Sequence, residues 1–157
     1  MNTQLDEAVG RPAGGRSLRV LIVEDETLVG LFVQGALLDL GHTVSGIAPS
    51  FRTALAIAAG VPNDLAIVDI GLAGDGGDGI DTAIALRERY GLASVLMTGS
   101  PYASIEARVD GAGPLGVLMK PFTEGDVERA LAVAAPRLSQ KRADLGGTGS
   151  NPDLQGK

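Results

Sequence analysis

Short apolar runs alternate five times with segments of helical periodicity, and this alternation constrains the fold more than any other feature. The runs are Leu18–Val23, Thr43–Ile47, Leu65–Val68, Val95–Met97 and Gly116–Met119. Between them, apolar side chains recur at the three- and four-residue spacing of a helix that packs on one face. The sequence has no two-residue hairpin signal between the runs. The pattern predicts a parallel α/β sheet with helices on both faces.

The ends of the expected helices carry capping residues. The expected N-terminal caps are Ser50, Asp78, Ser100 and Thr123. Pro101 follows Ser100 at the first helical position, and Asp126 completes a capping-box-like pair with Thr123. Pro136 is expected to end the last helix, because proline disrupts a helix interior.

The chain is expected to form one folded domain with loose ends. We predict a domain over residues 17–136, between disordered tails at 1–16 and 137–157. Both tails are polar and punctuated by glycine and proline, so they bury too little apolar surface to offset their ordering entropy.

Composition excludes several classes of function. The chain has no cysteine, which rules out disulfides, thiolate metal sites and cysteine nucleophiles. A net charge of −6 and an aromatic content of 3% argue against nucleic-acid binding. No apolar run approaches the roughly 20 residues of a membrane span, and the first residues do not resemble a signal peptide. We therefore expect a cytoplasmic protein that binds neither nucleic acid nor membrane.

Polar residues stand where four of the predicted strands end. They are Glu24-Asp25, Asp69, Thr98 and Lys120-Pro121. Because parallel strands present their carboxyl ends on one edge of the sheet, these side chains are expected to converge there. Three carboxylates, a hydroxyl and an ammonium would then share a small space.

Such a set suits a divalent cation and a phosphoryl group. Crowded carboxylates repel one another, and an all-oxygen ligand set favours a hard ion such as Mg²⁺. Lys120 and Thr98 can contact phosphoryl oxygens, and Asp69 can act as the nucleophile that forms an aspartyl phosphate. Taken singly, each residue has a plainer explanation: the Glu24-Asp25 pair can favour a helix N-terminus, and Lys120 can be a solvated strand end.

At these residues the chain resembles the receiver domains of bacterial two-component response regulators. The matching pieces are Val23-Glu24-Asp25-Glu26, Val68-Asp69-Ile70, Met97-Thr98-Gly99 and Met119-Lys120-Pro121-Phe122. The resemblance runs from about Arg19 to Ala135 and implies a flavodoxin-like (βα)5 fold, doubly wound, with strand order 2-1-3-4-5.

The resemblance also implies a role for each matching residue. Asp69 is the phosphoacceptor, and Asp25 and Asp69 hold Mg²⁺ together with the carbonyl of Gly71. Glu24 helps to hold the ion through water, while Thr98 and Lys120 contact the phosphoryl oxygens. The Lys120–Pro121 bond is expected to be cis.

The implied function is that of a stand-alone response regulator receiver, a CheY-like signalling protein and not an enzyme. Its phosphoryl donor would be a phosphohistidine of a sensor histidine kinase or of a histidine phosphotransfer protein. It would signal by docking to a downstream protein or act as a phosphate sink. Two departures from the family matter: Val117 stands where many receivers carry a switch aromatic, and Met97-Thr98-Gly99 differs from the commoner threonine-alanine pair.

Three other functions fit parts of the pattern. An aspartyl-nucleophile phosphatase or phosphomutase usually has a second aspartate two residues after the first, where this chain has Gly71. A flavin or nucleotide module would need a glycine motif after the first strand, and none is present. A receiver-like module that only binds partners would not need the intact acceptor set.

Two further expectations concern the surface. Leu28, Leu31 and Leu38 form a second apolar stripe on the first helix, which is either covered or a docking surface for the histidine-containing partner. His42 is expected to be an exposed turn residue. Asp75, Asp78 and Asp81 are expected to form a solvated loop and helix cap.

Overall fold

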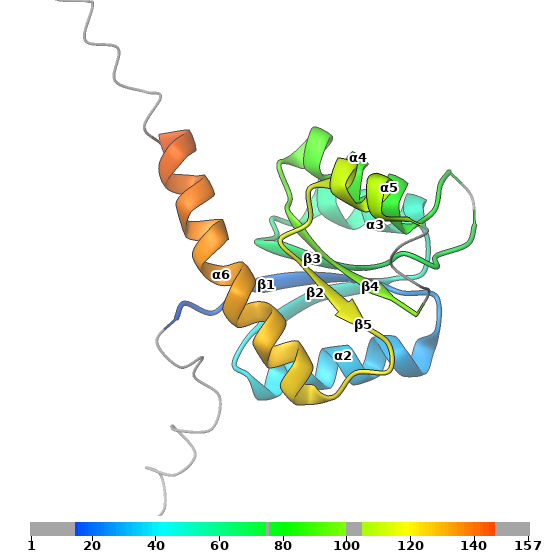
Figure 1. Ribbon diagram of the computed structural model, residues 1–157, viewed down its shortest axis with the longest axis horizontal. Coiled ribbons are helices and arrows are strands. Elements are labelled where there is room, and N and C mark those ends of the chain that lie inside the picture. The colour runs from blue at the N-terminus through cyan, green and yellow to red at the C-terminus, as the bar shows by residue number, and fades with distance from the viewer. Residues whose placement is uncertain (1–14, 75, 100–104, 147–157) are drawn as a thin grey trace, which may run out of the picture.

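The computed structural model describes residues 15–74, 76–99 and 105–146. In this part of the chain, five parallel strands form one sheet in the order β2-β1-β3-β4-β5 (Figure 1). The strands are β1 (Arg19–Val23), β2 (Thr43–Ala48), β3 (Leu65–Asp69), β4 (Ser94–Thr98) and β5 (Gly116–Met119). The predicted fold and strand order are confirmed.

Helices cover both faces of the sheet (Figure 1). They are α2 (Thr27–Asp39), α3 (Phe51–Gly60), α4 (Gly79–Tyr90), α5 (Glu106–Ala112) and α6 (Glu124–Gly146). Helices α2 and α6 pack on one face, and α3, α4 and α5 pack on the other. Because all the strand pairs are parallel, the five strands have their carboxyl ends at the same edge of the sheet.

The sheet separates two apolar cores. On β1, Val20 and Ile22 face the α2 and α6 side, whereas Leu21 and Val23 face the α3, α4 and α5 side. All four side chains are fully buried. Continuous apolar runs are required here because a strand between two helical layers has no solvated face.

The predicted caps at three helices are present. Ser50 accepts a hydrogen bond from the third residue of α3 at 3.2 Å. Asp78 and Asp81 form a reciprocal capping box at α4, with bonds of 2.9 and 3.0 Å. Thr123 and Asp126 exchange the same pair of bonds at the start of α6, at 2.8 and 3.2 Å. Ser100 and Pro101 lie outside the described residues, as does Asp75.

The last helix does not end at Pro136 as predicted; α6 continues to Gly146. Proline within a helix costs about 3 kcal/mol, but the next turn recovers stabilising contacts. Leu138 is buried in the core, and the Arg137 guanidinium donates to the Leu115 carbonyl at 2.8 Å. The packed body therefore extends past residue 136, while residues 1–14 and 147–157 lie outside the description.

His42 is buried, contrary to the prediction of an exposed turn residue. Its Nδ1 accepts a hydrogen bond from the Leu18 N–H at 3.0 Å, and burial lowers the pKa of the imidazole. The histidine thus joins the end of α2 to the start of β1.

Among the described residues, no helix is both long and apolar enough to cross a membrane.

Candidate functional site

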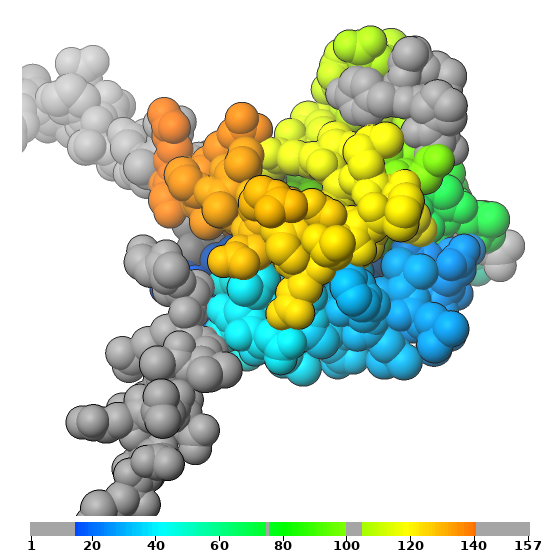
Figure 2. Space-filling model, turned by 60° about the horizontal axis from the view of Figure 1, so that its bottom comes forward, coloured from blue at the N-terminus to red at the C-terminus, as the bar shows by residue number. Residues whose placement is uncertain are grey.

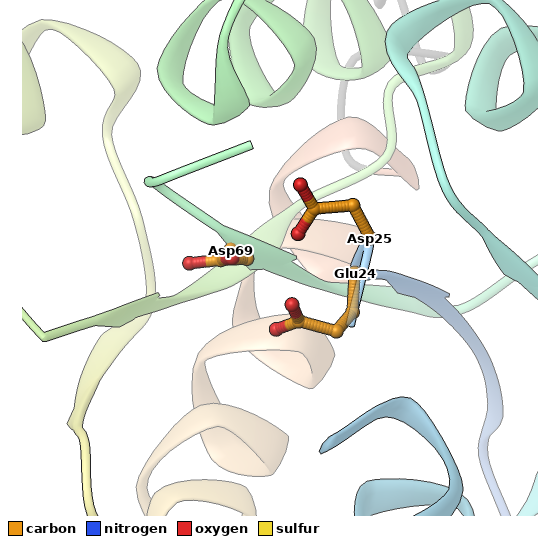
Figure 3. Close-up of side chains that lie close together, drawn as sticks. All are labelled: Glu24, Asp25 and Asp69. Carbon is orange, nitrogen blue, oxygen red and sulfur yellow. The ribbon is translucent and has the colours of Figure 1, made fainter. Parts of the chain in front are cut away.

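Three carboxylates meet at the carboxyl edge of the sheet (Figure 3). Glu24 and Asp25 follow β1, and Asp69 is the last residue of the adjacent strand β3. One oxygen of each carboxylate lies within 4.8 Å of the others. The three carboxylates thus converge as predicted from the strand ends.

Lys120 reaches the same place from the end of β5. Its Nζ lies 3.1 Å from Glu24 Oε2 and 3.3 Å from Asp69 Oδ2. The Lys120–Pro121 peptide bond is cis, as predicted, and the Lys120 N–H donates to the Thr98 carbonyl at 2.7 Å. The backbone of β4 therefore holds the lysine at the site.

Glu24 is the most deeply buried acid of the set, with 1% of its surface exposed. Burial raises its pKa from 4.5 to about 7, assisted by the negative charge of Asp69. A hydrogen bond from the Glu26 N–H at 3.1 Å and the contact with Lys120 act in the opposite direction. Near pH 7 a fraction of the chains therefore carries a protonated Glu24.

The ammonium of Lys120 keeps its proton. Partial burial alone would lower its pKa, but hydrogen bonding to Glu24 and the charges of Glu24 and Asp69 raise the pKa overall. A permanent positive charge therefore stands between the two buried acids. The sequence predicted that Lys120 would join the site, but not that it would pair with Glu24.

Asp69 and Asp25 differ in their surroundings. One oxygen of Asp69 accepts from the Gly71 N–H at 3.1 Å, and the other faces Lys120. The Asp69 side chain is 7% exposed, whereas Asp25 is open to solvent. The Asp69 carboxylate is thus held from two sides at the base of a site that opens past Asp25.

Gly79 brings the start of α4 directly against the backbone of Asp69. A Cβ at this position would lie 1.8 Å from the Asp69 carbonyl oxygen, so no larger residue fits without movement. The Gly79 N–H points back to the Ile70 carbonyl at 3.4 Å. Sequence reasoning missed this constraint; the available signal was a glycine immediately after the capping residue Asp78.

Thr98 ends β4 and is buried, with 1% of its surface exposed. Val117 pairs with Leu96 of β4 and packs against the core under α3, α4 and α5. The side chain is too small to make the swing that an aromatic ring makes between two positions.

The donor set fits a magnesium ion. It consists of carboxylate oxygens only, and Mg²⁺ binds through one or two carboxylates while it keeps several waters. The exposure of Asp25 leaves room for those waters. The acidic cluster is the type of pocket at which receiver domains bind Mg²⁺.

An apolar surface lies beside the site on α2. We define the α2 apolar surface by its exposed members Leu28, Leu31, Phe32 and Leu38, which are between 46% and 82% exposed. It adjoins an open groove of about 560 Å³ whose far wall is formed by Lys120, Pro121 and Phe122. Figure 2 shows this side of the molecule, where α2 in blue lies against the yellow and orange chain of α6. The stripe is therefore not buried within the described part of the chain, although about half of the Leu31 and Leu38 surface is covered.

Comparison with known proteins identifies the family. The family model described as "Response regulator receiver domain" matches residues 20–132, and the chain belongs to this family. It is a receiver domain of the kind that two-component systems use.

Relatives and solved structures agree with this assignment. The transcriptional regulatory protein PdtaR of Mycobacterium tuberculosis is 30% identical over 88% of this chain and 63% of its own length. The phyllosphere-induced regulator PhyR of Methylorubrum extorquens is 28% identical over 83% of this chain and 48% of its own length. This chain therefore spans about half to two thirds of these two relatives.

Among structures, the receiver domain of a modulated diguanylate cyclase from Desulfovibrio desulfuricans superposes with a TM-score of 0.74 at 29% identity. That match covers 80% of this chain and 99% of the other. The chemotaxis response regulator CheY4 of Vibrio cholerae gives a TM-score of 0.68 at 24% identity, over 76% and 99% of the two chains, and supports the fold.

Proposed function

We propose that this chain accepts a phosphoryl group from a phosphohistidine onto Asp69. The observation that carries the proposal is the environment of the Asp69 carboxylate. One oxygen is held by the Gly71 N–H and the other faces the Lys120 ammonium, beside two more carboxylates. A nucleophile is thus positioned next to a cation and a metal-binding set, and phosphoryl transfer depends mainly on positioning and neutralisation.

In the proposed step, an Asp69 oxygen attacks the phosphorus of the donor. A new O–P bond forms and the P–N bond breaks, and the electron pair of that bond stays on the departing imidazole. The ammonium of Lys120 lies 3.1 Å from Glu24 and 3.3 Å from Asp69. It is therefore close enough to contact a phosphoryl oxygen on Asp69 without leaving the site. The Thr98 hydroxyl is proposed to donate to another phosphoryl oxygen.

Magnesium, held by Asp25, Asp69 and the Gly71 carbonyl and assisted by Glu24, would neutralise the carboxylates and the phosphoryl oxygens. Glu24 contributes in a second way, because its high pKa limits repulsion while the ion is absent. In this proposal the phosphoryl group is later hydrolysed by water or passed to a partner, so the modification is temporary.

The donor is proposed to dock on the α2 apolar surface. This surface begins next to the acceptor, since the groove beside it has Lys120 in its wall. Helix α2 contains no charged residue from Thr27 to Leu38, so an apolar helical partner meets no desolvation penalty for charge there. The expected donor is a sensor histidine kinase or a histidine phosphotransfer protein. A downstream protein target is expected to bind after phosphorylation.

Intact-protein mass spectrometry after incubation with acetyl phosphate tests the proposal. With Mg²⁺, the wild-type chain is expected to gain one phosphate, and Asp69→Ala is expected to gain none. Asp39→Ala, which removes an exposed aspartate at the end of α2, is the matched control and is expected to label like the wild type. A wild-type chain that stays unlabelled at saturating acetyl phosphate would support a binding module that does not use phosphate.

A further inference from the structure

Helix α5 is attached to α4 at both of its ends by arginine side chains. Near its C-terminus, Arg87 of α4 donates to the carbonyls of Ala112 and Gly111 at 2.6 and 3.2 Å. Near its N-terminus, Arg108 of α5 reaches back to the capping box of α4. The two attachments lie at opposite ends of α5, and only the second involves the start of α4, where the connection from Asp69 ends.

The Arg108 attachment is a cluster of charges around the α4 cap. The guanidinium lies 2.9 Å from Asp78 Oδ2, 3.2 Å from Asp78 Oδ1 and 3.6 Å from Asp81 Oδ1. We call Arg108, Asp78 and Asp81 the cap clamp. Partial burial raises the pKa of Asp78, but hydrogen bonds from Arg108 and the Asp81 N–H outweigh burial and lower it overall.

The cap clamp is one residue away from the main chain of the acceptor. Asp78 immediately precedes Gly79, whose Cα rests against the Asp69 carbonyl so closely that no Cβ fits. A shift of the Asp69 carbonyl toward α4 would meet Gly79 directly, and the aspartate that Arg108 binds is the next residue along the chain. The contacts are continuous from the acceptor residue to α5, and they do not pass through Val117.

We propose that the cap clamp transmits the occupancy of the acceptor site to α5, with Arg108 as a positioning residue. The proposal rests on the proposed function, since it takes the phosphoryl group on Asp69 as the input. It supplies an output for a receiver in which Val117 replaces the switch aromatic. Because coupling between two sites is reciprocal, the state of the clamp also changes the affinity of the acceptor site.

Hydrogen–deuterium exchange of the full chain tests this coupling. Beryllofluoride with Mg²⁺ serves as the probe for the loaded site, and peptides from α5 report the output. In the wild type, loading is expected to change exchange in α5 by about fivefold or more, the lower end of common allosteric couplings. Arg108→Gln is expected to lose most of this change while it still binds beryllofluoride.

Two variants separate transmission from a structural effect. Arg89→Gln removes an exposed arginine of α4 that has no ion pair among the described residues, and it should respond like the wild type. Arg108→Lys keeps the charge without the two-pronged geometry and should restore part of the response.

Each result has a defined meaning. A wild type that does not bind beryllofluoride overturns the proposed function and the clamp with it. If the wild type binds beryllofluoride but α5 does not respond, or if Arg108→Gln responds as fully as the wild type, the clamp proposal fails while the proposed function stands.

Discussion

Replacing Glu24 by glutamine is expected to remove part of the pH dependence of the free energy of unfolding. Glu24 is buried beside Asp69, and burial raises its pKa from 4.5 to about 7. Below pH 4.5 the carboxyl is neutral in both the folded and the unfolded chain. Between the two pKa values the unfolded chain releases the proton and the folded chain keeps it, so stability falls as the pH rises.

The size of the effect follows from the two pKa values. Complete ionisation in both states costs the folded chain about 3 kcal/mol, because each pKa step corresponds to about 1.4 kcal/mol. Between pH 5 and pH 8 the loss amounts to about 2–3 kcal/mol. Glu24→Gln carries no titrating group at this position, so its stability relative to the wild type should improve by that amount over the same range.

Urea unfolding at pH 5, 6, 7 and 8 in EDTA measures the difference. Glu88→Gln, which removes an exposed carboxylate from α4, is the control for the loss of one acidic group. Added Mg²⁺ should stabilise the wild type at pH 8 more than Glu24→Gln, because the ion relieves the buried charge. A stability difference between Glu24→Gln and the wild type that does not change with pH would refute this reasoning.

Three further predictions concern the lysine, a glycine and the docking surface. Lys120→Gln should bind Mg²⁺ several-fold more tightly, since a competing cation is lost, while its labelling by acetyl phosphate slows by roughly tenfold or more; calorimetry and timed mass spectra measure the two effects. Gly79→Ala should lower the free energy of unfolding by about 3 kcal/mol or more, whereas Gly35→Ala, in an open part of α2, should raise it by about 0.5–1 kcal/mol in urea titrations. Leu28→Glu should reduce phosphotransfer from a histidine kinase that labels the wild type and leave acetyl phosphate labelling unchanged; equal loss with both donors would contradict a docking role.

Much of the fold followed from local signals. Apolar runs bounded by polar residues fixed the strands to within one or two residues, and Ser50 and Asp78 marked the starts of their helices. The site could also be predicted from the sequence, because parallel strands bring Asp69 and Lys120 to one edge of the sheet whatever their side-chain conformations. The family resemblance then supplied the strand order.

The errors arose where distant contacts outweigh local preference. Pro136 favours the end of a helix, but the burial of Leu138 stabilises the continuation of α6 beyond the proline. His42 is polar and sits in a turn, yet it fills a buried position because it accepts the Leu18 N–H. The pairing of Arg108 with Asp78 joins residues 30 positions apart, and no spacing rule relates them.

The central claim is that Asp69, and no other acid, receives the phosphoryl group. Borohydride reduces an aspartyl phosphate to homoserine, so peptide mapping of the labelled and reduced chain locates the acceptor. We expect homoserine at position 69 alone, and none after labelling without Mg²⁺ in EDTA. Homoserine at Asp25 or Asp78 in place of position 69, or phosphate stable to borohydride, would contradict it.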